Sequence, residues 1–117
     1  GIDNKLNYST EEQVVGKWWN GKPLYSRTIK ETTSTTEWRK SLSSYGLTNL
    51  DEVFVNGNSF RRWSLNEGTS SQAANYFLST SDWGAAYIDT NGQLTLRSSN
   101  STTEYWTITL NYTKTTD

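Results

Sequence analysis

The sequence predicts an all-β domain, either an antiparallel β-sandwich of jelly-roll type or a barrel of about eight to nine short strands. Three observations lead to this fold class. Short segments rich in β-branched and aromatic residues recur along the whole chain, separated by polar turn residues. Asn-Gly pairs, which favour tight hairpin turns, stand at 20–21, 56–57 and 91–92. No segment has the apolar spacing of an amphipathic helix.

The length of the chain allows one domain. Its 117 residues leave no room for a second hydrophobic core. The first dozen residues are polar and irregular, so we predict an entry segment over residues 1–12 and a single β domain over residues 13–117. The absence of Met predicts that the chain is the terminal piece of a longer protein or a trimmed form of one.

The first half of the domain begins with a predicted hairpin. Residues 14–19 form a strand, Asn20-Gly21 a two-residue type I′ turn, and residues 24–30 the return strand. The Thr/Ser-rich segment 32–36 is a loop or a polar edge strand, and residues 38–45 form a further strand.

The middle of the chain contains a second predicted hairpin. Residues 53–55 and 60–65 are its strands, joined at Asn56-Gly57. Residues 73–79 form the next strand, which ends in a predicted turn over residues 81–84.

The last third of the chain has the clearest alternation of apolar and polar residues. Asn91-Gly92 joins a strand over residues 85–89 to one over residues 93–97. The final strand, residues 105–112, places apolar side chains on one face and polar side chains on the other. The apolar face consists of Trp106, Ile108, Leu110 and Tyr112.

The composition indicates a folded domain whose core is rich in aromatic rings. Leu, Ile, Val and Phe together count only 21 of 117 residues, a proportion that is typical of disordered chains. Disorder also requires high net charge and few aromatic residues, whereas this chain has a net charge of −1 and 13 Trp and Tyr residues. Large rings therefore replace aliphatic side chains.

The composition also excludes several kinds of chemistry. Without Cys or His the chain has no thiol nucleophile, no disulfide, no Ser-His-Asp triad and no thiolate or imidazole ligand for a metal. No Asp-x-Asp calcium loop is present, so we predict neither a metal nor a cofactor. The carboxylates lie mostly at predicted turns and strand ends, so we predict that the protein is not an enzyme, with a small glycosidase as the least favoured alternative.

The charge pattern bears on possible partners. The near-zero net charge and the absence of a basic run argue against nucleic acid. No apolar stretch approaches the ~20 residues of a transmembrane helix, so we predict no membrane insertion.

The six Trp residues are the best candidates for ligand binding. An exposed Trp or Tyr ring packs against the C–H face of a sugar, and neighbouring polar side chains bond its hydroxyls. The alternative is that the Trp rings fill the core, which we expect for Trp106. Trp18 and Trp19 point to opposite faces, so at least one is exposed. The predicted ligand-binding residues are Trp38, Trp63, Tyr76, Asp82 and Trp83.

Both ends of the chain resemble a recurrent module of phages and prophages. Residues 8–25, YSTEEQVVGKWWNGKPLY, are similar to the opening of a C-terminal domain of tail-fibre, baseplate and other minor structural proteins. Residues 106–117, WTITLNYTKTTD, are similar to the closing segment of that domain. The sequence departs from the module at Trp19-Asn20, where an apolar residue followed by Asp is expected, but Asn keeps the turn chemistry.

The resemblance implies a β-structured domain on a phage tail, located in the virion and homotrimeric. Its implied partner is a host cell-surface polysaccharide or glycan, and it transfers no functional residues because the matched ends are structural. Two alternatives stay open: an extracellular carbohydrate-binding module of a secreted bacterial protein, and a purely structural trimerisation or tip domain without a ligand.

Overall fold

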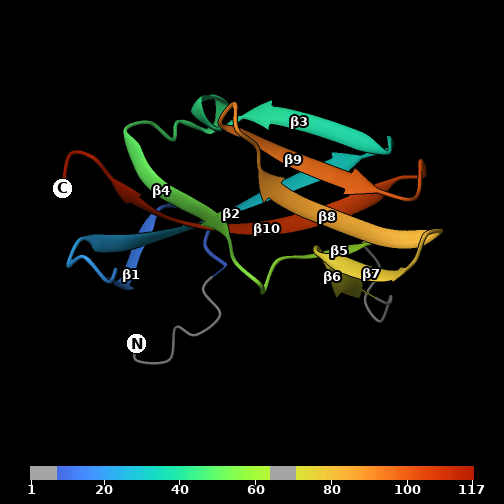
Figure 1. The fold of residues 1–117 in the computed structure, drawn as a ribbon, viewed down its shortest axis with the longest axis horizontal. Coiled ribbons are helices and arrows are strands. Elements are labelled where there is room, and N and C mark those ends of the chain that lie inside the picture. The colour runs from blue at the N-terminus through green and yellow to red at the C-terminus, as the bar shows by residue number, and fades with distance from the viewer. Residues whose placement is uncertain (1–7, 64–70) are drawn as a thin grey trace.

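The protein folds into two antiparallel β-sheets packed face to face, as the sequence predicts. A computed structural model describes residues 8–63 and 71–117, and Figure 1 shows the arrangement of their strands. The ten strands are β1 Gln13–Lys17, β2 Pro23–Thr33, β3 Glu37–Ser41, β4 Leu50–Val55, β5 Phe60–Arg62, β6 Ser71–Ala73, β7 Tyr76–Ser79, β8 Asp82–Ile88, β9 Gln93–Ser98 and β10 Glu104–Lys114.

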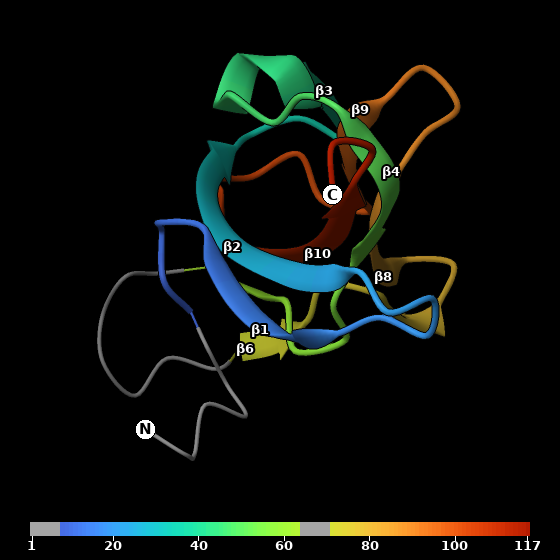
Figure 2. The ribbon, with the colours of Figure 1, turned by 90° about the vertical axis from the view of Figure 1, so that its left-hand side faces the viewer.

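The first sheet has six strands and the second has four. The first runs in the order β1-β2-β10-β5-β6, with β4 also paired to β10, and the second runs in the order β3-β9-β8-β7. Seen end-on, the strands curve around a common interior (Figure 2). Of the helices among the described residues, none is long and apolar enough to cross a membrane.

Strand β10 is the centre of the first sheet. It pairs with β2 along one side, and on the other side with β5 in its first half and β4 in its second half. Its predicted apolar face is confirmed, because Trp106, Ile108, Leu110 and Tyr112 are all at most 1% exposed. Burial of these four side chains contributes on the order of 1.5–3 kcal/mol each, which makes β10 the main source of hydrophobic stabilisation.

Two of the three Asn-Gly pairs form hairpins, but with a longer loop than predicted. In the β1–β2 hairpin, Gly21 N–H donates to the Trp18 carbonyl at 2.9 Å, and Trp18 N–H donates to the Lys22 carbonyl at 2.8 Å. The same pattern closes the β8–β9 hairpin between Asp89 and Gln93.

The loops are three-residue loops built on a type I turn, so the predicted type I′ turn is wrong. A type I′ turn needs positive φ at both central residues, whereas here only the glycines of the two pairs have it, at 84° for Gly21 and 71° for Gly92. This places Trp19 at a loop tip, where it is 79% exposed, and confirms that one of Trp18 and Trp19 is exposed.

The third pair, Asn56-Gly57, does not join a hairpin, and that prediction is wrong. β4 and β5 do not pair with each other, because both pair with β10. Ser59 N–H donates to the Asn56 carbonyl at 3.0 Å, which closes a local turn opposite Thr109 of β10. The backbone bulges out for this one turn and then rejoins the same edge of β10.

Three predicted element boundaries also differ from the structure. The strand expected over residues 38–45 ends at Ser41 and is followed by a 3₁₀ helix over Leu42–Tyr45. The strand expected over residues 73–79 is divided between β6 and β7, which belong to different sheets. The turn expected over residues 81–84 ends earlier, because Asp82 and Trp83 already belong to β8.

The space between the sheets contains a buried ion pair at one end. Arg61 of β5 and Glu104 of β10 have fully buried side chains, with 3.1 Å between Arg61 Nη1 and Glu104 Oε2. Arg61 also donates to Ser98 Oγ of the second sheet and to Gln72 Oε1 of β6, both at 2.9 Å. The guanidinium carbon lies 5.5 Å from the centre of the Trp106 ring. One arginine therefore connects its own strand, β5, to three others, β6 and β10 of the first sheet and β9 of the second.

Gly84 of β8 leaves the space that the Arg61 guanidinium occupies. A Cβ atom at position 84 would lie 2.5 Å from Arg61 Cζ, well inside van der Waals contact. The guanidinium is fixed by its partners and cannot move aside without breaking them. Only glycine fits at this position.

We predict that Gly84→Ala lowers the free energy of unfolding by about 1–3 kcal/mol, as expected for overpacking of a filled core. Urea unfolding followed by circular dichroism measures the effect. Gly16→Ala is the matched control, because nothing lies within 4 Å of a Cβ at that position. Equal stability of the two variants would contradict the proposed steric role of Gly84.

Residues 8–12 lie against the edge and one end of the first sheet. Ser9 accepts from Thr28 N–H at 2.8 Å, continuing the line of β1 along β2. Glu12 then accepts from the Tyr112 hydroxyl at 2.6 Å and from Lys114 Nζ at 2.8 Å. Burial alone would raise the pKa of Glu12, but the hydrogen bonds from Lys114 and Tyr112 and the positive charge of Lys114 outweigh it and leave that pKa below its ordinary value.

We predict a loss of stability on acidification that depends on Glu12. Its folded-state pKa is lowered, so its contribution is fully present above the unfolded-state pKa and disappears as the pH falls through the folded-state value. Urea unfolding between about pH 7 and pH 3 should show Glu12→Gln less stable than the native chain at neutral pH, with the difference vanishing in acid. A difference that is constant over this range would contradict the assignment.

Candidate functional site

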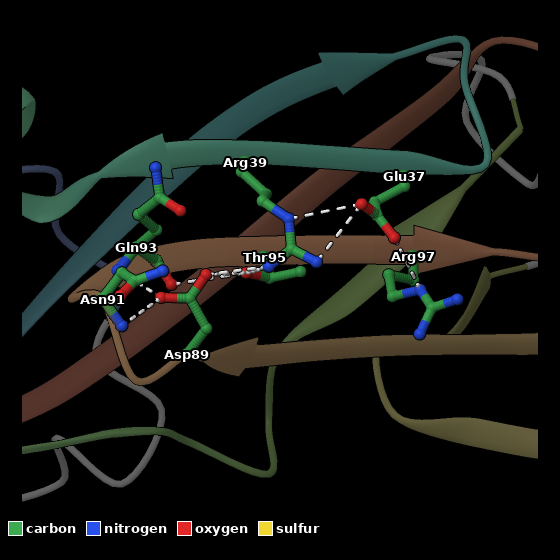
Figure 3. Close-up of polar contacts among 7 residues, drawn as sticks. All are labelled: Glu37, Arg39, Asp89, Asn91, Gln93, Thr95 and Arg97. Atoms are coloured by element: carbon green, nitrogen blue, oxygen red, sulfur yellow. Dashed lines mark hydrogen bonds and ion pairs between the residues drawn. The ribbon is translucent and has the colours of Figure 1, made fainter.

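The outer face of the second sheet carries a continuous row of charged residues. Alternation along β3 and β9 turns Glu37 and Arg39 outward opposite Arg97 and Thr95, respectively. Figure 3 shows these side chains in one row, which ends at Asp89 in the β8–β9 loop.

The charges in this row alternate in sign and are paired with one another. Arg39 Nη1 lies 2.8 Å from Asp89 Oδ2, and Arg39 Nη2 lies 3.2 Å from Glu37 Oε2. The other oxygen of Glu37 lies 3.4 Å from Arg97 Nε. The four side chains therefore hold one another in place along the face (Figure 3).

Asp89 anchors one end of the row to the backbone. Its Oδ1 accepts from the N–H groups of Asn91 at 2.9 Å and Gln93 at 3.0 Å, and its Oδ2 accepts from the Thr95 hydroxyl at 3.1 Å. Burial would raise the pKa of Asp89, but the backbone hydrogen bonds, with those from Thr95 and Arg39, lower it below its ordinary value. Asp89 is therefore charged at neutral pH.

The other end of the row reaches Trp83. The Arg97 guanidinium carbon lies 5.7 Å from the centre of the Trp83 ring, within the range of a cation–π contact. The main chain of Trp83 is held by Ser99, whose N–H donates to the Trp83 carbonyl at 3.1 Å and whose Oγ accepts from Trp83 N–H at 3.0 Å. Trp83 is therefore fixed from two sides.

An open pocket of about 400 Å³ lies beside this tryptophan. Its lining combines one indole, one carboxylate, one guanidinium and five hydroxyl-bearing residues. These residues are Thr36, Glu37, Thr80, Ser81, Trp83, Arg97, Ser98 and Ser99. We call this hollow the Trp83 pocket.

The structure places two of the predicted site residues at or near this pocket. Trp83 lines it, and Asp82 precedes Trp83 at the start of β8, half-buried and opposite Ser79.

The other three predicted site residues lie elsewhere. Trp38 stands opposite Leu96 and packs against the hydrophobic core between the sheets. Tyr76 is half-buried opposite Gly84, and Trp63 is half-buried with its ring centre 5.8 Å from Arg61 Cζ. The five residues therefore do not form one surface.

Sequence reasoning missed most of the pocket residues. Glu37 and Arg97 are ordinary outward residues of their strands, and only the β3–β9 register brings them together. Phe77, which is 71% exposed and opposite Trp83, was also missed. Its position within the apolar triplet Tyr76-Phe77-Leu78 was the one available signal.

The described residues contain no group of three or more carboxylates close enough to hold a metal ion. A comparison with known proteins gives no match to a family model, to a curated protein or to a solved structure. The function must therefore be argued from the pocket itself.

Proposed function

We propose that this protein is a non-enzymatic binding domain that recognises a saccharide at the Trp83 pocket. The single observation that carries the proposal is the combination of one fixed indole with hydroxyl groups and a paired Glu37 and Arg97 in one open hollow. An aromatic face binds the C–H face of a sugar ring, and planar charged groups bond its hydroxyls in pairs.

The pocket is preorganised for such a ligand. Glu37 is held by Arg39 and Arg97, and Trp83 by Arg97 and Ser99. Fixed side chains lose little conformational entropy on binding, so more of the contact energy is left for affinity. The openness of the pocket suits a polymer, whose chain must enter and leave at the ends.

The lining of the pocket favours binding over hydrolysis. A glycosidase needs two carboxyl groups on either side of the scissile bond. The Trp83 pocket is lined by one, Glu37, and both of its oxygens are engaged by arginines.

The resemblance of the chain ends to the phage module makes a host cell-surface polysaccharide the proposed ligand and the virion tail the proposed location. A carbohydrate-binding module of a secreted bacterial protein would use the same pocket in an extracellular setting. Fusion to a fibrous region would favour the first setting, and fusion to a catalytic domain the second.

A structural role as a trimerisation or tip domain is the second candidate, and the edge of the first sheet favours it. Strand β1 is exposed along its whole length and is the outermost described strand on its side of the first sheet. Val14, 62% exposed, and Trp19, 79% exposed, add apolar surface there. Exposed edges and apolar residues of this kind are commonly covered by another chain.

We predict that Trp83→Ala weakens saccharide binding by a factor on the order of thirty, the effect of removing an aromatic hot spot. A glycan array of bacterial surface saccharides identifies the ligand, and isothermal titration then gives the affinities.

The matched control for this experiment is Phe54→Ala, which removes a partly exposed ring from the first sheet and should leave affinity unchanged. Equal losses in both variants, or an unchanged affinity in Trp83→Ala, would refute the proposed site. Circular dichroism checks that both variants fold.

We predict that the domain is a homotrimer held in part by the β1 edge. Multi-angle light scattering should give three times the 13.3 kDa chain mass for the native chain. The double variant Val14→Lys, Trp19→Ser should shift the mass towards that of the monomer, because a charge replaces apolar contact. A monomer mass for the native chain at every concentration would rule out the trimer.

A further inference from the structure

The outer face of the first sheet holds a second hollow, on the opposite side of the sandwich from the Trp83 pocket. It has a volume of about 250 Å³ and crosses β2, β10 and β5. The strand registers place two rows of outward side chains there. One row is Thr32, Tyr105 and Arg62, and the next is Lys30, Thr107 and Phe60. We call this hollow the Lys30–Arg62 groove.

The two cations of the groove stand on the strands that flank β10. Arg62 lies in the row of Thr32, two residues along the strands from the row of Lys30, so the backbones of Lys30 and Arg62 are separated diagonally by roughly 12 Å. The Arg62 guanidinium carbon lies 5.7 Å from the centre of the Phe60 ring, which stands in the same row as Lys30. The Phe60 ring is in turn held by Tyr8, edge to face at 6.1 Å.

These cations have no carboxylate partner among the described residues. Six of the ten Lys and Arg residues in that part of the chain form ion pairs, and neither Lys30 nor Arg62 is among them. Glu31 is the one carboxylate residue among the described residues that line the groove. The Glu31 side chain faces the other side of the sheet. There Glu31 Oε2 accepts from the Tyr45 hydroxyl at 2.6 Å and lies 3.5 Å from Lys40 Nζ.

Two unpaired like charges on a common face repel each other, and no ion pair with a described residue offsets that repulsion. The rest of the groove supplies hydrogen-bond donors, because Thr32, Tyr105 and Thr107 each present a hydroxyl group. This is the chemistry that recognises an oxyanion, through charge-assisted hydrogen bonds from Lys and Arg.

We propose that the Lys30–Arg62 groove binds an oxyanion, a carboxylate or phosphate group carried on a small polar ligand. The anion lies between the Lys30 ammonium and the Arg62 guanidinium, with the Thr107 hydroxyl beneath it and Tyr105 at its side. The proposal is independent of saccharide binding at the Trp83 pocket, because the two hollows share no residue and lie on different sheets.

Isothermal titration with three probes tests the chemistry: inorganic phosphate, D-glucuronate and D-glucose. Phosphate or glucuronate should bind, and glucose should bind at least tenfold more weakly. Binding of phosphate alone identifies the free anion as the preferred form, and binding of glucuronate alone identifies a carboxylate borne on a sugar. Equal binding of glucose, or binding of none of the three, would overturn the proposal.

Single variants test the location. Lys30→Gln and Arg62→Gln should each weaken binding of the anionic probe about tenfold, the effect of losing one charged hydrogen bond. Lys17→Gln is the matched control, because Lys17 is an exposed cation on β1 that forms no ion pair with a described residue and lies away from β5 (Figure 1). A comparable loss in Lys17→Gln would indicate a general effect of net charge and would refute the site.

A measurement on the native chain alone keeps the proposal testable if a variant fails to fold. Amide NMR shifts on addition of the anionic probe should concentrate at Thr32, Tyr105 and Thr107. Raising the salt from ~0.05 M to ~0.5 M should weaken them, since exposed charges are screened. Shifts confined to other residues, or an affinity independent of salt, would overturn the assignment.

Discussion

The buried ion pair between Arg61 and Glu104 is the interaction on which the packing of the two sheets depends. Removing two charges from water costs several kcal/mol each, and their attraction offsets this only when the remaining polar atoms also find partners. Arg61 finds two such partners in Ser98 and Gln72 and contacts the face of Trp106. Arg61 Nε and both Glu104 oxygens are buried without a hydrogen-bond partner among the described residues, so these two charges depend mainly on each other. Loss of one member would leave an uncompensated buried charge, at a cost of about 3–5 kcal/mol. The pair therefore fixes how the second sheet lies on the first.

The same ion pair connects the interior to the Trp83 pocket through the alternation of the strands. Gly84 and Ser98 face inward and contact Arg61, while their neighbours Trp83 and Arg97 face outward and line the pocket. The contacts of Gly84 and Ser98 with Arg61 therefore help to position the neighbouring Trp83 and Arg97 on the outer face. Because the guanidinium has little freedom between Gly84 and Trp106, the two strand ends that carry the pocket are held in one relative position. The buried ion pair therefore supports the backbone of the two strands that carry the pocket.

The sequence predicts those features of the structure that depend on neighbouring residues in the chain. The alternation of β10 and the hairpins at Gly21 and Gly92 follow from side-chain period and from the need for positive φ. Asn56-Gly57 has the same local signal but no hairpin, because β10 is long enough to accept both β4 and β5 on one edge. The site is less predictable for a related reason. Trp38 and Trp83 both have polar neighbours in the sequence. The packing of the sheets turns Trp38 towards the core and leaves Trp83 at the pocket. Arg61 and Glu104 are charged residues at buried positions of their strands. The alternation of apolar and polar residues therefore cannot predict that they lie between the sheets.

The two outer faces differ in how they balance charge, and this difference bears on what each would bind. On the second sheet Asp89, Arg39, Glu37 and Arg97 neutralise one another in a row, so the Trp83 pocket has little net field and suits a neutral sugar. On the first sheet the anion nearest Lys30 in sequence, Glu31, is turned to the opposite face, and neither Lys30 nor Arg62 forms an ion pair with a described residue. The net charge of −1 for the whole chain does not show this difference. The outer face of the second sheet is locally neutral, and the Lys30–Arg62 groove is locally positive. A ligand with both ring hydroxyls and acidic groups would find a suitable surface on each side of the sandwich, and a neutral polymer on one side only.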